Sequence, residues 1–187
     1  IMLTSHVQKI AQVLNILVLI TFICNLTALP LVPGLVLFRF NLEKIQSLWT
    51  YDWDDCLGNF SHALVTWWTR GEPYTIVLTL FLLFAGICTA VILWQGHRVL
   101  GTILEGAPFS LENAVFLRRS AVSAFVISAA ALVRLVFSIC YYRSPAPLLT
   151  YNALFVPIFA MAGLLCLVMS ALFRQAAELK EDQDLTI

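Results

Sequence analysis

The stretch YTIVLTLFLLFAGICTAVILWQ, residues 74–95, decides the fold, because it runs for 22 residues without a charged side chain. A helix needs about 20 apolar residues to cross the hydrocarbon core of a bilayer. Backbone N–H and C=O groups inside the hydrocarbon must bond to one another, and a single segment achieves this as a helix. The stretch therefore predicts a membrane-spanning helix.

Three further apolar runs of similar length surround this one, at residues 8–29, 120–142 and 151–173. The 187-residue chain is 60% hydrophobic and 12% charged, with a mean hydropathy of +0.88. Soluble domains carry about 25% charged residues. The sequence therefore predicts an all-α fold, a four-helix bundle embedded in the bilayer as a single transmembrane domain over residues 1–187.

The basic residues near the ends of these spans predict the orientation, because cytoplasmic loops carry an excess of Lys and Arg. One side holds Lys9, Arg98, Arg118, Arg119, Arg174 and Lys180, while the basic residues of the other side are spread over a long loop. We therefore expect both termini, a hairpin at residues 96–119 and a tail at 174–187 in the cytoplasm. The loop at residues 30–73 is expected outside.

The polar segment EGAPFSLENAVFLRR, residues 105–119, predicts a tight turn between two helices. Gly106 is suited to the left-handed cap that ends a helix. Ser110 is a good N-cap, and Glu112 places negative charge in the first turn of the next helix. Phe109 is expected to pack back on that helix.

Two motifs resemble a known family. GAPFSLENAVFLRR, residues 106–119, resembles the G-x-PF-S-x-EN-x-x-x-LRR signature of the bacterial membrane family called domain of unknown function 2975. LFRQAAELKEDQDLTI, residues 172–187, resembles the ending of that family. The resemblance implies a multi-pass protein of the bacterial cytoplasmic membrane without an established activity. Residues 31–73 carry no part of it.

Members of that family are found beside small helix-turn-helix regulators, so the resemblance implies a cytoplasmic transcription regulator as partner. Both motifs fall on the predicted cytoplasmic face, where acids of the tail could pair with Arg98, Arg118 and Arg119 of the hairpin. The candidate docking residues are Glu112, Asn113, Arg118, Arg119, Glu178, Glu181, Asp182 and Asp184. The alternative for the tail is a solvated helix end.

Arg134 is the one charged residue deep inside a predicted span. It precedes Tyr142 by about 12 Å of helix. A charge there is costly against lipid, so it should face the protein interior or extend toward the interface. Its candidate partners are Asn25, Thr79, the Ala153 carbonyl group and acids of the outer loop. Arg134 then either binds an anionic ligand or lipid headgroup in an outward cavity, together with Asn25 and Thr79, or is a structural residue.

Small residues recur in two spans, as Ser120, Ala124 and Ser128 in one and as Gly86 and Ala90 in another. Such residues let helix backbones approach closely in lipid. They serve either packing within the bundle or an oligomer interface. The sequence leaves both open.

Other polar residues do not form a recognisable site. The acids of YDWDDC, residues 51–56, lack the glycine and the closing glutamate of a calcium loop. A bridge between Cys56 and Cys140 is an open alternative. No nucleophile, zinc or phosphate-binding motif occurs, and zero net charge does not indicate direct nucleic-acid binding. We expect a non-enzymatic membrane protein without metal or cofactor, either a regulatory docking protein or a ligand-binding sensor.

Overall fold

The computed structural model describes residues 2–30, 32, 73–107 and 109–184. The outer-loop predictions, including the acids of residues 51–56 and a Cys56 bridge, lie outside these described residues. Within them the chain is all-helical, without strands, as predicted. Its elements are α1 (Met2–Ala28), α5 (Pro73–Leu104), α6 (Leu111–Tyr142), the 3₁₀ turns η2 (Ala146–Leu149) and η3 (Tyr151–Leu154), and α7 (Phe155–Asp184).

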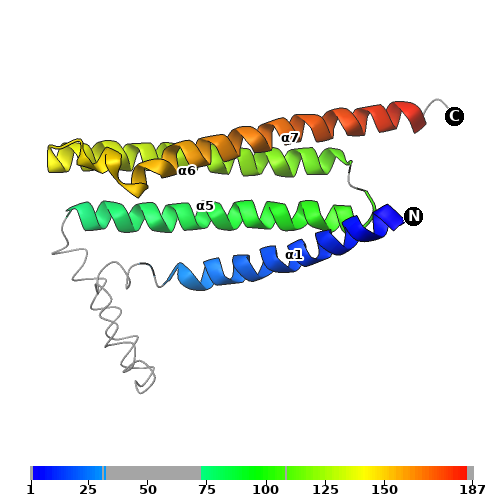
Figure 1. Cartoon of the computed structure of the whole chain (residues 1–187), viewed down its shortest axis with the longest axis horizontal. Helices are drawn as coiled ribbons and strands as arrows, with labels where there is room; N and C mark the ends of the chain where they lie inside the picture. The colour runs from blue at the N-terminus through cyan, green and yellow to red at the C-terminus, as the bar shows by residue number, and fades with distance from the viewer. Residues whose placement is uncertain (1, 31, 33–72, 108, 185–187) are drawn as a thin grey trace, which may run out of the picture.

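The four long helices pack in chain order, α1 on α5, α5 on α6, and α6 on α7 (Figure 1). All four are long and apolar enough to cross a membrane. In the most apolar part of α6 33% of the residues are buried, against 6% in α1 and α7. The core therefore lies along α6, and α1 and α7 expose most of their apolar surface, which suits contact with lipid.

The helices define two ends of the molecule (Figure 1). At the hairpin end lie the start of α1, the turn between α5 and α6, and the end of α7. At the tyrosine end lie the start of α5, the end of α6, and the turns η2 and η3. Tyr74, Tyr141 and Tyr142 gather there, with ring centroids 5.2–6.2 Å apart. The two termini thus share one end, as an even number of spans requires.

The turn at the hairpin end is built as the sequence predicts. Gly106 has φ +83° and ends α5, because the Gly106 and Ala107 N–H groups donate to the carbonyls of Ile103 and Thr102. Ser110 accepts a 3.3 Å bond from the Asn113 N–H and caps α6. The packing of Phe109 differs from the prediction. Its ring lies 5.9 Å from Phe173 of α7, so it joins two helices rather than folding back on α6.

The small residues serve packing within the chain. Ser120, Ala124 and Ser128 are all buried along α6. Gly86 lies so close to α1 that a Cβ atom there would meet Leu29 at 2.6 Å. Of the two roles the sequence left open, the described residues show close helix packing inside one chain.

Two interhelical hydrogen bonds set the register of α6 against α7. The Ser128 hydroxyl donates to the Val156 carbonyl at 2.8 Å, and the Ser170 hydroxyl donates to the Ala114 carbonyl at 2.6 Å. Both bonds fit one antiparallel register, in which residue 118 lies level with residue 166. This register decides which residues can meet at the hairpin end.

Candidate functional site

Arg134 is buried in the protein, with 7% of its surface exposed. It lies on the face of α6 that meets α5, and its guanidinium carbon is 4.8 Å from the centroid of the Phe81 ring. Phe81 in turn makes an edge contact with Phe155, the first residue of α7, at 6.4 Å. The arginine is therefore held against an aromatic stack that joins three helices.

The stack leaves the polar edge of the guanidinium unpaired. Among the described residues, Arg134 makes no hydrogen bond or ion pair through its side chain. Buried charges in proteins are normally paired, since an unpaired one loses hydration without compensation. The guanidinium instead lines a cavity of about 490 Å³ at the tyrosine end.

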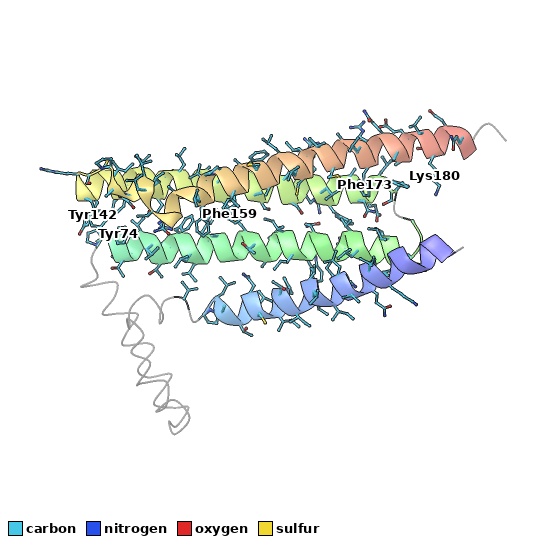
Figure 2. The ribbon with its side chains drawn as sticks, viewed as in Figure 1. Tyr74, Tyr142, Phe159, Phe173 and Lys180 are labelled. Atoms are coloured by element: carbon cyan, nitrogen blue, oxygen red, sulfur yellow. The ribbon has the colours of Figure 1, made fainter. Side chains whose placement is uncertain are left out.

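The cavity is formed by the end of α6, the start of α5 and the turns η2 and η3. Figure 2 shows Tyr74 and Tyr142 together at this end. Besides Arg134, its polar lining consists of Tyr74, Ser138, Tyr142, Ser144, Thr150 and Asn152. Its volume falls in the range of small-molecule sites, about 300–1,000 Å³.

Three hydroxyl groups of the lining already have local partners. Ser138 donates to the Arg134 carbonyl at 2.9 Å, and Thr150 donates to the Pro147 carbonyl at 2.6 Å. Ser144 accepts a 3.3 Å bond from the Ala146 N–H, which leaves its own proton for an acceptor. The arginine, the Ser144 hydroxyl and the Asn152 amide can therefore all donate to a ligand.

The charge of the cavity follows from its lining. Arg134 is the only ionisable side chain there besides the two tyrosines, and no Asp or Glu is among the described lining residues. The side chains around the cavity therefore carry a net charge of +1. Such a lining attracts an anion.

The partners predicted for Arg134 lie elsewhere. Thr79 is fully buried on α5, but its hydroxyl donates to the Thr75 carbonyl of the same helix at 2.8 Å. Asn25 belongs to α1, which packs on α5 and not in the cavity wall. The Ala153 carbonyl accepts from the Phe155 N–H, because α7 begins at that residue and Pro157 falls in its first turn.

The sequence pattern did not single out Phe81, Tyr74, Ser144 or Asn152 for this site. Phe81 is one of many apolar residues in its span, and its partner depends on how α5 and α6 align. The hydrogen bond from Thr102 to the Asn113 Oδ1, at 2.7 Å, sets that alignment at the hairpin end. From there, three seven-residue steps along each helix lead to Phe81 and Arg134, so a heptad count was the available signal.

The candidate docking residues at the hairpin end divide into exposed and buried ones. Asn113 is fully buried and bonded to Thr102, so it belongs to the helix–helix contact rather than to a docking surface. Glu112 is exposed in the first turn of α6. It lines a hollow of about 410 Å³ with Phe109, Leu111, Lys180 and Glu181. Figure 2 shows Lys180 at this end, beyond Phe173.

The expected pairing of the tail acids with the hairpin arginines is not observed. Glu178 pairs with Arg174 of its own helix at 2.8 Å, which raises the pKa of that arginine. The register of α6 and α7 places Arg118 level with Cys166, about 18 Å along the helix from Glu178. Arg98 lies 5.3 Å from the Phe116 ring centroid.

The remaining docking candidates are exposed. Arg118 and Arg119 lie on the outer face of α6, and Glu181 and Asp182 lie on the last turns of α7. Asp184 ends α7, and its side chain lies outside the described residues. Across the described residues, no three His, Cys, Asp or Glu side chains come close enough to hold a metal ion.

The comparisons with known proteins address membership of a family. Neither the curated proteins nor the solved structures include a match to this chain. The model of the family described as "Protein of unknown function (DUF2975)" matches residues 8–187, nearly the whole chain, including both motifs and all four long helices. The chain is therefore a multi-pass membrane protein that belongs to the DUF2975 family.

Proposed function

We propose that this protein is a membrane receptor that binds an anionic ligand in the cavity beside Arg134. The observation that supports this is a nine-tenths buried guanidinium without a hydrogen-bond or ion-pair partner among the described residues, facing a cavity of about 490 Å³. Binding an anion would satisfy the guanidinium and restore the pairing that buried charges require.

The proposed role is binding without catalysis. Acyl or phosphoryl transfer needs a nucleophile with a base in reach, or a metal. The described lining of the cavity offers serine, threonine and tyrosine hydroxyls, with no histidine, carboxylate or cysteine beside them to act as the base. This composition favours a sensor that holds its ligand over an enzyme that converts it.

Native mass spectrometry of the protein purified from its own membranes tests the proposal. The wild type should carry a small anionic molecule that Arg134→Gln lacks, because glutamine keeps a similar length but removes the charge. Arg119→Gln is the matched control, since Arg119 is an exposed arginine on the same helix. An identical set of bound molecules in all three proteins would contradict the proposal.

A second proposed function is docking of a cytoplasmic partner at the hairpin end, in a bacterial cytoplasmic membrane with both termini inside. The supporting observation is the hollow between the turn and the last turns of α7. Phe109 and Leu111 are about half exposed there (53% and 50%), beside Glu112, Lys180 and Glu181. A small helix-turn-helix regulator is the partner proposed from the family resemblance.

Co-purification from native membranes in mild detergent tests this second function. A helix-turn-helix regulator should be recovered with the intact chain and lost with Leu111→Glu, which places a charge in the hollow. Leu179→Glu is a matched control, because Leu179 is also exposed at this end of α7 but does not line the hollow. Recovery of the regulator with Leu111→Glu, or its absence with the intact chain, would contradict docking at this surface.

A further inference from the structure

We infer that the cavity takes a ligand with a singly charged oxyacid group, a carboxylate or a phosphodiester, and discriminates against a doubly charged phosphate monoester. This rests on the proposed function, and it adds the chemical class of the anion. Three properties of the site carry it: the count of charges around the cavity, the orientation of the arginine, and the surroundings at its depth.

The first property is the match of charge. One guanidinium is the only permanently charged side chain among the described residues of the lining. A singly charged anion neutralises it. A phosphate monoester carries about −1.5 to −2 charges at pH 7. The second charge of such a group would have no countercharge in a mostly buried site, and burying an unpaired charge is costly.

The second property is the way Phe81 holds the guanidinium. The ring lies 4.8 Å from the guanidinium carbon and blocks the approach of a ligand from that side. The N–H groups lie in the guanidinium plane and present a planar fork. A carboxylate, or two oxygens of a phosphodiester, matches this fork with two parallel hydrogen bonds. The Ser144 hydroxyl is a further donor in the lining.

The third property is the depth of the site. Arg134 lies about 12 Å along α6 from Tyr142, and its neighbours Val133 and Val136 are 70% and 53% exposed. In a membrane-spanning helix such aliphatic side chains face hydrocarbon. The anionic group of the ligand is therefore bound beside the apolar phase, where a single charge is cheaper to place than two.

A carboxylate or phosphodiester could reach the cavity from two sources, as the headgroup of a membrane lipid or as a small acid from water. The lining accepts both, because Ala131, Leu135 and Pro147 complement its polar residues. The shared chemistry is the singly charged oxyacid group, and the source is decided by experiment.

The test is a binding titration of the full chain in nanodiscs of phosphatidylcholine at neutral pH, read by native mass spectrometry. The probes are oleate, phosphatidylglycerol, phosphatidic acid and water-soluble hexanoate. The proteins are the wild type, Arg134→Gln, Arg134→Lys and the control Arg119→Gln. Helical circular dichroism of each variant establishes that it is folded before it is titrated.

The inference predicts that oleate or phosphatidylglycerol binds the wild type at least roughly tenfold more tightly than phosphatidic acid does. Arg134→Gln should weaken that binding by at least roughly tenfold. Arg134→Lys should fall between the two, because lysine keeps the charge and loses the fork. Binding of hexanoate would identify a soluble acid as the source, while binding of the amphiphiles alone would identify a lipid, and both support the class.

Two results would overturn these ideas, and they differ. Equal or tighter binding of phosphatidic acid, still lost in Arg134→Gln, would overturn the singly charged class and leave the anion receptor standing. Absence of binding by every probe, or binding that is the same in Arg134→Gln, would overturn the anion receptor together with the class.

Discussion

Phe81 and Arg134 face each other across the contact between α5 and α6, with the guanidinium carbon 4.8 Å from the ring centroid. Both residues are buried, with 6% and 7% of their surfaces exposed. A cation over an aromatic face contributes about 0.5–2 kcal/mol, most when it is desolvated. The pair thus joins the stability of the fold to the orientation of the residue that is proposed to bind the ligand.

A double-mutant cycle should reveal this coupling. Phe81→Leu and Arg134→Met each remove one partner while keeping an apolar side chain of comparable length. We expect a coupling free energy of about 1 kcal/mol from thermal or denaturant unfolding in detergent. Additive effects of the two substitutions would show that the contact contributes nothing to stability. Phe81→Leu should also weaken anion binding, because the guanidinium loses the ring that orients it.

Asn113 should behave as a structural residue of the hairpin and not as a docking residue. Asn113→Ala removes its bond to Thr102 in a fully buried position, and we expect a loss of about 1–3 kcal/mol in the free energy of unfolding. The adjacent exposed Glu112 is the control, where Glu112→Ala should cost about 0.3–1 kcal/mol through the helix dipole. A smaller effect at Asn113 than at Glu112 would contradict the buried assignment.

Two glycines at the hairpin end should respond to alanine in opposite directions. Gly106 has φ +83°, so Gly106→Ala forces an alanine into the left-handed region at about 1–2 kcal/mol. Gly101 is helical, and a Cβ atom there would meet no other atom within 4 Å, so Gly101→Ala should stabilise α5 by up to about 1 kcal/mol. Melting temperatures of the two variants in the same detergent check the signs.

Two other glycines test the helix contacts inside the membrane. A Cβ atom at Gly163 would lie 3.0–3.1 Å from three atoms of the Phe125 ring, which moves as a rigid unit. At Gly86 it would meet only the tip of Leu29, which can rotate away. Gly163→Ala should therefore lower stability by about 1 kcal/mol or more, whereas Gly86→Ala should be near neutral. The reverse order would show that α7 packs on α6 differently.

The fold could be read from the sequence because its determinants are local. Lengths of apolar runs predict the four helices, and Gly106 and Ser110 predict the turn from their own conformational preferences. Both were confirmed, and so was the family. Arg134 stood out as well, since a charge inside an apolar span is conspicuous in one dimension.

The contacts of the site could not be read in the same way, because they depend on how neighbouring helices align. Phe81 has the same composition around it as other phenylalanines of α5, and only the register against α6 brings it to Arg134. The same register buries Asn113 and separates Arg118 from the tail acids. A motif such as SLEN therefore identified a family without showing that its asparagine points inward.

Photo-crosslinking tests the central claim most directly, because it locates the ligand on the chain. A fatty acid with a photoreactive diazirine near its carboxylate would be irradiated with the wild type, Arg134→Gln and Arg119→Gln in nanodiscs, and the labelled peptides mapped. An anion bound at Arg134 predicts labels concentrated in residues 131–154 of the wild type and the control, and lost in Arg134→Gln. Labels spread along the lipid-facing surfaces of α1 and α7 and unchanged in Arg134→Gln would contradict an anion site at Arg134.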